Sequence, residues 1–553
     1  MKKNFLLMLV AVVYLSACKK SSTPAAPQSF YLSYSVNGGN NGTNVYTKLN
    51  VNPVVRFSFS SVLESANISS NFSLVDNSNA AVPITVSVLN NDSVVVVQPT
   101  NPLKGFSKYT LSVSAGLLSS TKATLLNPVS INLTTAIDSS DKFPQITDSA
   151  LLTLVEQQTF KYFWDYGHPI SGLARERYSS ATTVTTGGSG FGIMAMLVGV
   201  QRNFISHADA LTRITTIVNF LSNNVSRYHG AFPHWIDGGT GATIPFSSQD
   251  NGGDIVETSY MMQGLLCARQ FFSSTIDANE INLRNNINNL YNAVEWNWYR
   301  QNNQNVLYWN WSPDQGFIVN VTVTGWDEAL ITYVLAASSN TDSNAIPKIV
   351  YDNGWAKNGA MKNGNTFYGI QLPLGPDYGG PLFFAHYSFL GINPNSLSDA
   401  YANYWTQNVA HSQINYQYCV TNPSKYYGYS NLCWGLTASD EAGGYSAHAP
   451  DNDDGTITPT AAISSLPYTP TQSMNALKFF YYKLGDKTWG DYGFVDAFNL
   501  GTGWFDNDFL AIDQGPEIVM IENYRTGLLW NLFMSCPEVK NGMQKLGFSS
   551  PNL

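Results

Sequence analysis

The chain has 553 residues and a formal net charge of −9, and only 12% of its residues are charged. Such a weakly acidic chain offers nothing that attracts a nucleic-acid backbone, so we expect no nucleic-acid partner. The length fits one small domain and one large domain. Aromatic residues make up 13% of the sequence, and this is its most prominent compositional feature.

The N-terminus has the pattern of an export signal. It begins with MKKNFLLMLVAVVYLSACKK, in which two lysines precede an apolar run from Phe5 to Leu15, and small residues lead to Cys18. This pattern predicts a signal peptide over residues 1–18, which is too short to span a bilayer. The LSAC sequence is similar to a bacterial lipobox, so we expect Cys18 to be the lipidated first residue of the exported protein. An ordinary signal peptide with an incidental cysteine is the alternative.

Lipidation would make the N-terminus the only membrane attachment, since no other stretch is apolar for long enough to cross a bilayer. Lys19 stands where an acid would retain the protein at the inner membrane. We therefore expect the outer membrane, on its periplasmic or cell-surface face. Four further cysteines are Cys267, Cys419, Cys433 and Cys536. Export would permit a Cys419–Cys433 disulfide, but spacing alone does not establish one, and no cysteine pair has zinc-site spacing.

Residues 19–29 have the composition of a flexible tether. From 30 to 136, apolar and small polar residues alternate in short runs, such as 54–63, 84–99 and 109–118, between Asn, Gly and Pro turns. Short strands at regular spacing predict a β-sandwich. The segment resembles bacterial Ig-like domains in its NPLKGFSKYTLSVSAGL run and its closing INLTTA. We interpret it as a spacer, because it shows no ligand chemistry.

Residues 137–144 form a second linker, after which residues 145–553 have helical periodicity. Apolar residues recur at i, i+3, i+4 and i+7 in six clear segments, which are 148–167, 207–225, 254–272, 327–338, 469–484 and 516–533. Weaker candidates bring the total to about a dozen helices. They are separated by long loops, which in a compact helical domain are usually functional. We therefore expect an all-α domain, closed into a ring with a pocket at one end.

Three acids lie close together in SSQDNGGDIVETS, at Asp250, Asp254 and Glu257. Carboxylates this close repel one another, which raises the pKa of at least one. The structural interpretation makes Asp254 the N-cap of a helix and Glu257 the residue that completes a capping box. It leaves Asp250 unexplained, so we favour a functional cluster.

A second acidic pair, Asp327 and Glu328, opens the predicted helix in VTGWDEALITYVL. Acids at this position complement the helix dipole, which lowers a carboxyl pKa. A general acid needs the opposite shift, so burial against Trp326 would have to outweigh the dipole.

A third acidic stretch is AIDQGPEIVMIENYR. Pro516 fits the first position of a helix, which would place Asp513 in the turn before it. Glu517 would then lie in the first turn of the helix. Glu522 and Arg525 are three residues apart, a spacing that predicts an ion pair.

A glycine-rich loop in CWGLTASDEAGGYSAHAP brings together Trp434, Asp440, Glu441, Tyr445 and His448, which we consider candidates for contact with a substrate. The following DNDDG resembles a calcium loop, but its glycine is fifth and an EF-hand needs it sixth. We therefore expect no metal site.

Two more candidates for substrate contact are His386, in PLFFAHYSFLG, and Trp504, in WFDNDFLAIDQGP. For both His386 and His448, the alternative is a hydrogen-bonded histidine of the core. Most of the aromatic residues are likewise expected simply to pack between helices.

The chemistry of these residues points to carbohydrate. The sequence contains no nucleophile elbow, P-loop or HExxH motif. Separated carboxyl groups are what cleavage of a glycosidic bond requires. Aromatic rings bury the apolar faces of sugars while polar loop groups bind the hydroxyls. We expect no cofactor.

Five long segments resemble the glucoamylase-like family of bacterial (α/α)6-toroid proteins, which includes β-1,2-glucanases. The segments are GWDEALITYVLA, PLFFAHYSFLG, CWGLTASDEAGGYSAHAP, GTITPTAAISSLPYTP and WFDNDFLAIDQGPEIVMIENYRTGLLW. The resemblance extends from about residue 145 to 540. It implies an Ig-like β-sandwich followed by an (α/α)6 toroid, and β-1,2-glucan or its oligosaccharides as the substrate.

Matched residue by residue, the resemblance implies an inverting hydrolase with Glu328 as general acid and Asp513 as general base. The first acidic cluster lies in DNGGDIVETS. The glucanase branch of the family has this longer form of the stretch, whereas many other members have a shorter STIDTA-type form. The three acids of the cluster are then expected to bind sugar and set pKa values, as is Asp327.

Two other functions compete with this one. A non-catalytic, lipid-anchored glycan-binding protein would need aromatic residues but no paired carboxyls. A hydrolase of the same fold could instead cut another glucan.

Overall fold

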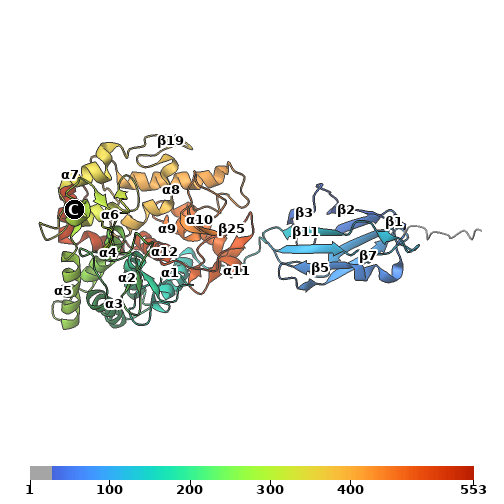
Figure 1. Ribbon diagram of the computed structural model, residues 1–553, viewed down its shortest axis with the longest axis horizontal. Helices are drawn as coiled ribbons and strands as arrows, with labels where there is room; N and C mark the ends of the chain where they lie inside the picture. Colours follow the sequence, from blue (N-terminus) through green and yellow to red (C-terminus); the bar gives the residue numbers. More distant parts are fainter. Residues whose placement is uncertain (1–27) are drawn as a thin grey trace, which may run out of the picture. The chain divides into compact units, whose positions relative to one another are not determined.

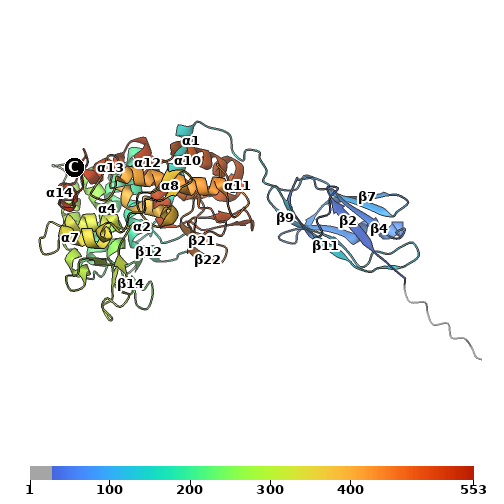
Figure 2. The same ribbon diagram turned by 90° about the horizontal axis from the view of Figure 1, so that it is seen from above.

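The computed structural model describes residues 28–553 (Figures 1 and 2). The chain divides into two compact units, one ending at Asp138 and the other running from Ser139 to Leu553, and each is described by itself. The predicted signal segment and the lipidation of Cys18 lie outside the described residues. No helix within 28–553 is long and apolar enough to cross a membrane.

The first unit is a β-sandwich, which confirms the prediction. Its two main sheets have the strand orders β3-β11-β9-β5-β6 and β2-β4-β8-β7. The strands are β1 Ser29–Phe30, β2 Leu32–Val36, β3 Val45–Leu49, β4 Val55–Phe59, β5 Phe72–Asp76, β6 Ala81–Val82, β7 Ile84–Leu89, β8 Val94–Pro99, β9 Lys108–Val113, β10 Thr124–Leu125 and β11 Val129–Thr135. In β4 the buried Val55, Phe57 and Phe59 alternate with exposed residues, so one face packs into the core. Strand structure begins at Ser29, inside the predicted tether, and Phe30 of this strand is buried in the core.

The second unit is an (α/α)6 toroid, in which outer and inner helices alternate along the chain (Figure 1). The outer elements are α1 Asp148–Trp164, α3 His207–Asn223, α5 Ala278–Asn292, α7 Lys348–Val350 continued by η4 Tyr351–Trp355, α8 Tyr404–Thr421 and α10 Pro470–Lys478. The inner elements are α2 Thr186–Gln201, α4 Ile255–Phe271, α6 Leu330–Ala337, the 3₁₀ turns η7 Leu382–Ala385 and η8 Tyr387–Leu390, α9 Pro459–Ser464 and α12 Ala511–Arg525. Two further helices, α13 Leu528–Met534 and α14 Pro537–Leu546, follow.

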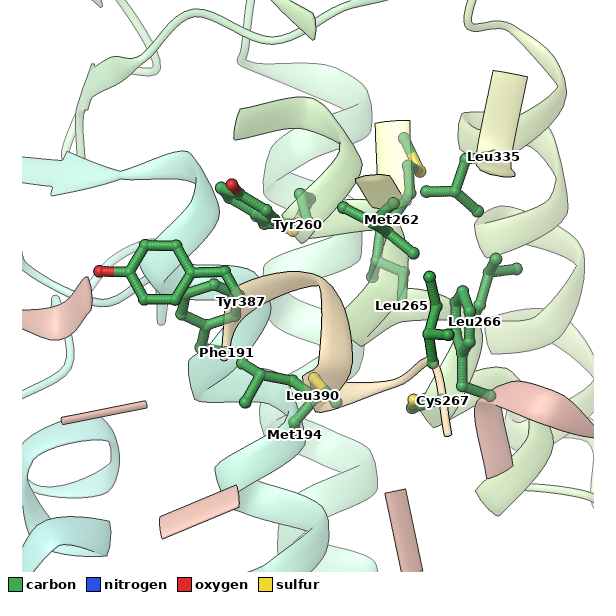
Figure 3. Packing of buried hydrophobic residues seen from close by; sticks show 14 of the residues in the cluster. Phe191, Met194, Tyr260, Met262, Leu265, Leu266, Cys267, Leu335, Tyr387 and Leu390 are labelled. Carbon is green, nitrogen blue, oxygen red and sulfur yellow. The ribbon is translucent and has the colours of Figure 1, made fainter. Parts of the chain in front are cut away.

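Helices whose residues are mostly apolar or small on every face occupy the inner ring, because neighbouring helices cover all of their sides. All eight residues of α6 are buried, whereas the outer helix α5 buries five of its 15. Figure 3 shows the resulting core, in which Phe191 and Met194 of α2, Tyr260 of α4, Leu335 of α6 and Leu390 of η8 come together.

Helices α2 and α4 approach each other through two glycines. A Cβ atom on Gly190 would lie 2.2 Å from the carbonyl oxygen of Tyr260, and one on Gly264 would lie 2.1 Å from the carbonyl oxygen of Gly190. Both distances are far shorter than a van der Waals contact, so only glycine allows this helix separation.

Three predictions of helix bounds are wrong. Helix α6 begins at Leu330, so Asp327 and Glu328 lie in the turn before it. The Asp327 carboxylate holds this turn by accepting the backbone N–H of Ala329 at 2.8 Å. The last predicted helix is divided into α12 and α13, because Gly527 between them has a left-handed φ of +72°.

Helix α12 begins at Ala511, and Pro516 lies inside it. The backbone N–H of Gln514 already bonds the Leu510 carbonyl at 2.9 Å. Proline only removes one donor, that to the Ile512 carbonyl, so the helix continues through it. Asp513 therefore belongs to the first turn of α12 and not to a preceding loop.

The predicted ion pair between Glu522 and Arg525 is replaced by a network that joins three helices. Arg202, the C-cap residue of α2, binds Glu522 at 2.6 Å, and Arg525 binds Glu156 of α1 at 2.5 Å. Both carboxylates are fully buried, so each needs a cation from a neighbouring helix. The four described cysteines are free thiols, so the permitted Cys419–Cys433 disulfide is not formed.

We expect Gly264→Ala to lower the free energy of unfolding of the toroid by about 2 kcal/mol, because the new methyl group meets a backbone oxygen that cannot move independently. Urea unfolding followed by tryptophan fluorescence isolates this unit, because all 13 tryptophans follow residue 160. Gly443→Ala is the matched control, since its methyl group would meet nothing within 4 Å. Equal stability of the two variants would contradict the packing argument.

Candidate functional site

One cavity of about 470 Å³ lies at the N-terminal ends of the inner elements. Its wall includes Thr185 just before α2, Glu257 of α4, Glu328 just before α6, Tyr387 of η8 and Ile512 of α12. Each inner helix is followed by an outer helix that returns the chain, so the inner helices begin at the same end of the ring. Their positive dipole ends therefore converge on the cavity and favour acidic groups there.

Aromatic side chains make up much of the remaining wall. They are Trp235, Phe246, Tyr260, Trp309, Phe383, Tyr387 and Tyr445. Phe246 and Tyr445 are each 51% exposed, although rings of this size are usually covered. Phe246 packs against Trp235 with a centroid distance of 4.8 Å. Ring faces held open in this way can bury the apolar face of a sugar.

Asp254 is the N-cap of α4, as predicted. Its Oδ1 accepts the backbone N–H groups of Val256 at 3.0 Å and Glu257 at 2.9 Å. Its Oδ2 lies 3.0 Å from Nδ1 of His234. Asp254 thus caps the helix with one oxygen and contacts His234 with the other. The structural interpretation of Asp254 is confirmed, and its functional role stays a prediction.

Glu257 does not complete a capping box. Its Oε2 instead accepts the backbone N–H of Gly187 in α2 at 2.6 Å. A Cβ atom at Gly187 would lie 2.6 Å from the same oxygen, so the contact requires glycine. Burial raises the pKa of Glu257, and the nearby His234 opposes the shift.

His234 is the cation of this first acidic cluster. Burial alone would lower its pKa, but the surrounding carboxylates raise it to about 9. Asp250 lies in the same cluster, with a pKa raised to about 6 by burial and by Asp254. The structure therefore joins the three predicted acids around one imidazolium.

Glu328 lines the cavity from the turn before α6. Its backbone carbonyl accepts the hydroxyl groups of Ser388 and Tyr260, which fixes the turn. Burial, and then the neighbouring Asp327, raise the pKa of the Glu328 carboxyl well above its usual range. Burial also raises the pKa of Asp327 to about 7. An upward shift of this kind is the direction that a general acid requires.

Asp513 belongs to a second acidic cluster, together with Asp440, Asp496 and Asp506. Burial raises the pKa of Asp513 to about 7, a hydrogen bond with Asp496 opposes the shift, and Asp440 adds to it. Arg177 is the cation here: its Nη1 binds both oxygens of Asp440, at 2.9 and 2.8 Å. Asp513 itself is 4% exposed.

Tyr387 connects the two acidic groups, because it lines the cavity and lies within electrostatic range of both. Burial is the largest cause of its strongly raised pKa, and the charges of Asp513 and Glu328 both contribute. Glu328, just before α6, is in the cavity wall, and Asp513 in the first turn of α12 directly follows Ile512, which is also in the wall.

Of the predicted substrate-contact residues, only Glu257 and Tyr445 are in the wall of this cavity. Asp250, Asp254, Asp327 and Asp440 belong to the acidic groups described above, and the other five belong to neither the wall nor these groups. His386 is buried against Ser465, 3.0 Å from its Oγ, and burial lowers its pKa to about 3. Trp434 is fully buried, and its indole N–H donates to the Gln472 carbonyl. His386 and Trp434 thus have the contacts of core residues.

The other three lie near the hairpin of β21 (Ala438–Glu441) and β22 (Gly444–Ala447) or on β26 (Trp504–Phe505). His448 is buried between the carboxylates of Glu441 and Asp454, 3.7 Å from each. Trp504 is half-buried. Two other candidates from this loop are at the site. Tyr445 lines the cavity, and Asp440 binds Arg177, which also lines it.

Several site residues escaped the sequence analysis, among them Arg177, His234, Tyr387 and Asp496. The run LARERYSS, which holds Arg177, was the strongest available signal, since charges are rare in this chain. Asp496 is a single acid in an apolar stretch, GFVDAFNL, and nothing local distinguishes it.

Three groups of described side chains could each offer three atoms to a cation. They are His234 with Asp250 and Asp254, Glu441 with His448 and Asp454, and Asp440 with Asp496 and Asp506, each set within 4.8 Å. His234 of the first set is itself a cation, and Asp440 of the third set is bound by Arg177. These cations favour proton chemistry over metal chemistry at the cavity.

Sequence families account for both units. Residues 35–135 match the bacterial Ig-like domain family, and residues 320–537 match the family described as "Putative glucoamylase". A curated relative, the exo beta-1,2-glucooligosaccharide sophorohydrolase (non-reducing end) of Parabacteroides distasonis, is 46% identical over 423 residues. That match covers 72% of this chain but 58% of the relative.

Solved structures extend the comparison. The β-1,2-glucanase of Parabacteroides distasonis is 36% identical, with a TM-score of 0.71 over 95% of this chain and 73% of the other. The endo-β-1,2-glucanase of Chitinophaga pinensis, in complex with sophorotriose and glucose, is 50% identical with a TM-score of 0.72. The match covers 74% of this chain and 100% of that one. With this identity over a complete relative, and with the toroid and its matching motifs, the chain belongs to the glucoamylase-like family.

Proposed function

We propose that this protein is a glycoside hydrolase that cleaves β-1,2-glucan or its oligosaccharides. The observation that supports this most strongly is a single aromatic-lined cavity with two different acidic groups around it. Glu328 is surrounded by other acids, whereas Asp513 has Arg177 nearby. Environments that separate two carboxyls in this way assign one as acid and the other as base.

Hydrolysis would proceed with inversion. The protonated Glu328 donates its proton to the glycosidic oxygen, and the bond from that oxygen to the anomeric carbon breaks. The Asp513 carboxylate accepts a proton from water, directly or through a hydroxyl or water chain, as the water oxygen bonds to the anomeric carbon from the opposite face. Protons exchanged with solvent then restore both groups.

The substrate class follows from the relatives, because those named above act on β-1,2-linked glucose. One is named as an exo enzyme and another as an endo enzyme. We further propose that the chain is exported and attached to the outer membrane through a lipid on Cys18. The LSAC motif and Lys19 support this placement.

Removing either reacting carboxyl should abolish most turnover. We expect Glu328→Gln and Asp513→Asn each to reduce kcat by about a thousandfold, because the proton donor or acceptor of the chemical step is lost. Glu295→Gln and Asp486→Asn make the same chemical changes on the exposed surface and should leave kcat unchanged. Near-normal turnover in both site variants, with folding intact, would exclude these roles.

The dependence of kcat/KM on pH should have its acidic limb near 7. Asp513 must be ionised to act as base, and its pKa is raised to about 7, so activity should fall about tenfold per pH unit below that value. The raised pKa of Glu328 keeps it protonated through neutrality, so the alkaline limb should lie higher. An acidic limb at pH 4 would show that Asp513 titrates as an ordinary carboxyl.

Incubation with linear β-1,2-glucan should release short β-1,2-linked oligosaccharides. A ladder of products indicates endo cleavage, and a single disaccharide from the start indicates exo cleavage. Parallel digests of β-1,3- and α-1,4-glucans serve as controls for linkage. Tight binding of β-1,2-glucan without any new reducing ends would instead favour a glycan-binding protein.

A further inference from the structure

Asp496 lies directly beside Asp513 in the second acidic cluster. It is fully buried in the turn between β24 (Gly493–Phe494) and β25 (Phe498–Asn499). Its own backbone N–H donates to the Asp508 carbonyl at 3.0 Å, and its Oδ2 accepts the backbone N–H of Asp440 at 2.7 Å. These two bonds fix the orientation of the Asp496 carboxyl.

The carboxyl groups of Asp496 and Asp513 are close enough for a hydrogen bond between them, which would lower the pKa of Asp513. Two ionised carboxylates only accept hydrogen bonds, so this bond needs a proton on one of them. Oδ1 of Asp496 and Oδ2 of Asp513 are both buried, and neither receives a hydrogen bond from any donor group of the described residues. A shared proton satisfies both oxygens.

The surroundings indicate which residue carries the proton. Asp513 lies in the first turn of α12, where the helix dipole favours a negative charge, and Arg177 also stabilises its ionised form. Asp496 instead faces three carboxyl groups, those of Asp513, Asp440 and Asp506, and burial raises its pKa well above the usual range. The proton therefore resides on Asp496.

We infer that Asp496 is a positioning residue: it retains a proton and donates it in a hydrogen bond to the Asp513 carboxylate. This inference rests on the proposed function of Asp513 as base. The hydrogen bond would hold one carboxylate oxygen and leave the other to accept the proton of the attacking water. Carboxylic acids kept neutral by buried sites serve as hydrogen-bond donors in this way.

A bound cation could also neutralise this cluster, since Asp440, Asp496 and Asp506 offer oxygens within 4.8 Å of one another. Both oxygens of Asp440 are already bound by Arg177, however. Calcium requires six to eight oxygen ligands. A proton on Asp496 needs no further ligands and explains the same unpartnered atoms.

Two substitutions at Asp496 separate hydrogen bonding from charge. The amide of Asp496→Asn can still donate to Asp513, so we expect kcat within about tenfold of the wild type and an acidic limb moved by less than half a pH unit. Asp496→Ala removes the donor that lowers the pKa of Asp513. We therefore expect its acidic limb to move upward by about one pH unit, and kcat to fall about a hundredfold.

The other groups that face this pair should not produce the same pattern. Tyr445 and Glu517 also lie within electrostatic range of the pair. The pKa values of both are raised, that of Glu517 to about 8, so both are neutral on the acidic side of a limb near pH 7. Equal pH profiles for Asp496→Asn and Asp496→Ala would overturn the hydrogen-bonding role.

An infrared difference spectrum tests the proton itself and does not require turnover. At neutral pH, the wild type minus Asp496→Asn should show the loss of a carboxylic-acid C=O band. Asp491→Asn, the same change on an exposed residue five positions away, should show the loss of a carboxylate band. A carboxylate band lost from Asp496→Asn would overturn the inference.

Calorimetric titration of the chelator-treated wild type with calcium chloride tests the cation. We expect no binding; calcium binding that Asp496→Asn abolishes would replace the shared proton with a metal site. If the wild type fails to cleave any glucan, the proposed function fails, and the infrared and calorimetric results still decide the state of Asp496. Should Asp496→Asn fail to fold, the infrared comparison can be made with Asp496→Ala.

Discussion

The burial of many acids beside few cations is the constraint on which this site depends. An isolated buried carboxylate costs several kcal/mol, and a helix N-terminus returns at most about 2 kcal/mol. The first cluster has His234 as its cation and the second has Arg177, so neither can hold all of its acids ionised. Protonation is the remaining solution, which is why Glu328, Asp327 and Asp513 have raised pKa values. The scarcity of positive charge thus supplies the proton that a general acid must carry.

Close helix packing is what makes this burial possible. The glycines of α2 allow α4 to approach so nearly that the backbone N–H of Gly187 reaches the Glu257 carboxylate at 2.6 Å. A backbone donor replaces a cation at this point, at no cost in side-chain entropy. The Arg202–Glu522 and Arg525–Glu156 pairs join α1, α2 and α12 elsewhere in the ring. In the network of α1, α2 and α12, each of the two carboxylates is paired with an arginine. Most carboxyl groups at the cavity have no such partner.

The sequence predicted the architecture well. Alternation of apolar and polar residues predicted the β-sandwich, helical periodicity predicted an all-α domain, and the resemblance of five segments to a known family implied the (α/α)6 toroid. The acids of the cavity were also found, since Asp250, Asp254 and Glu257 cluster in a chain with few charges. The predicted helix starts were wrong at Asp327 and Asp513. The Asp327 carboxylate accepts a hydrogen bond that holds a turn before α6, and α12 tolerates a proline and therefore begins before it. His234, Arg177 and Asp496 could not be found locally. Their roles arise from neighbours that are remote in the chain, such as the bond between Arg177 and Asp440, 263 positions apart.

The same asymmetry explains why the two carboxyls proposed to react, those of Glu328 and Asp513, are not interchangeable. The charged groups among the largest influences on Glu328 are the acids Asp327, Glu257 and Asp254, and all three raise its pKa. Asp513 has two influences in the opposite direction, the hydrogen bond with Asp496 and the charge of Arg177. As pH rises, Asp513 therefore loses its proton first. Between these two ionisations the pair consists of one acid and one base, which is the state that hydrolysis with inversion uses. The assignment of roles thus follows from the neighbours of each carboxyl, and reversing it would require moving Arg177 from one side of the cavity to the other.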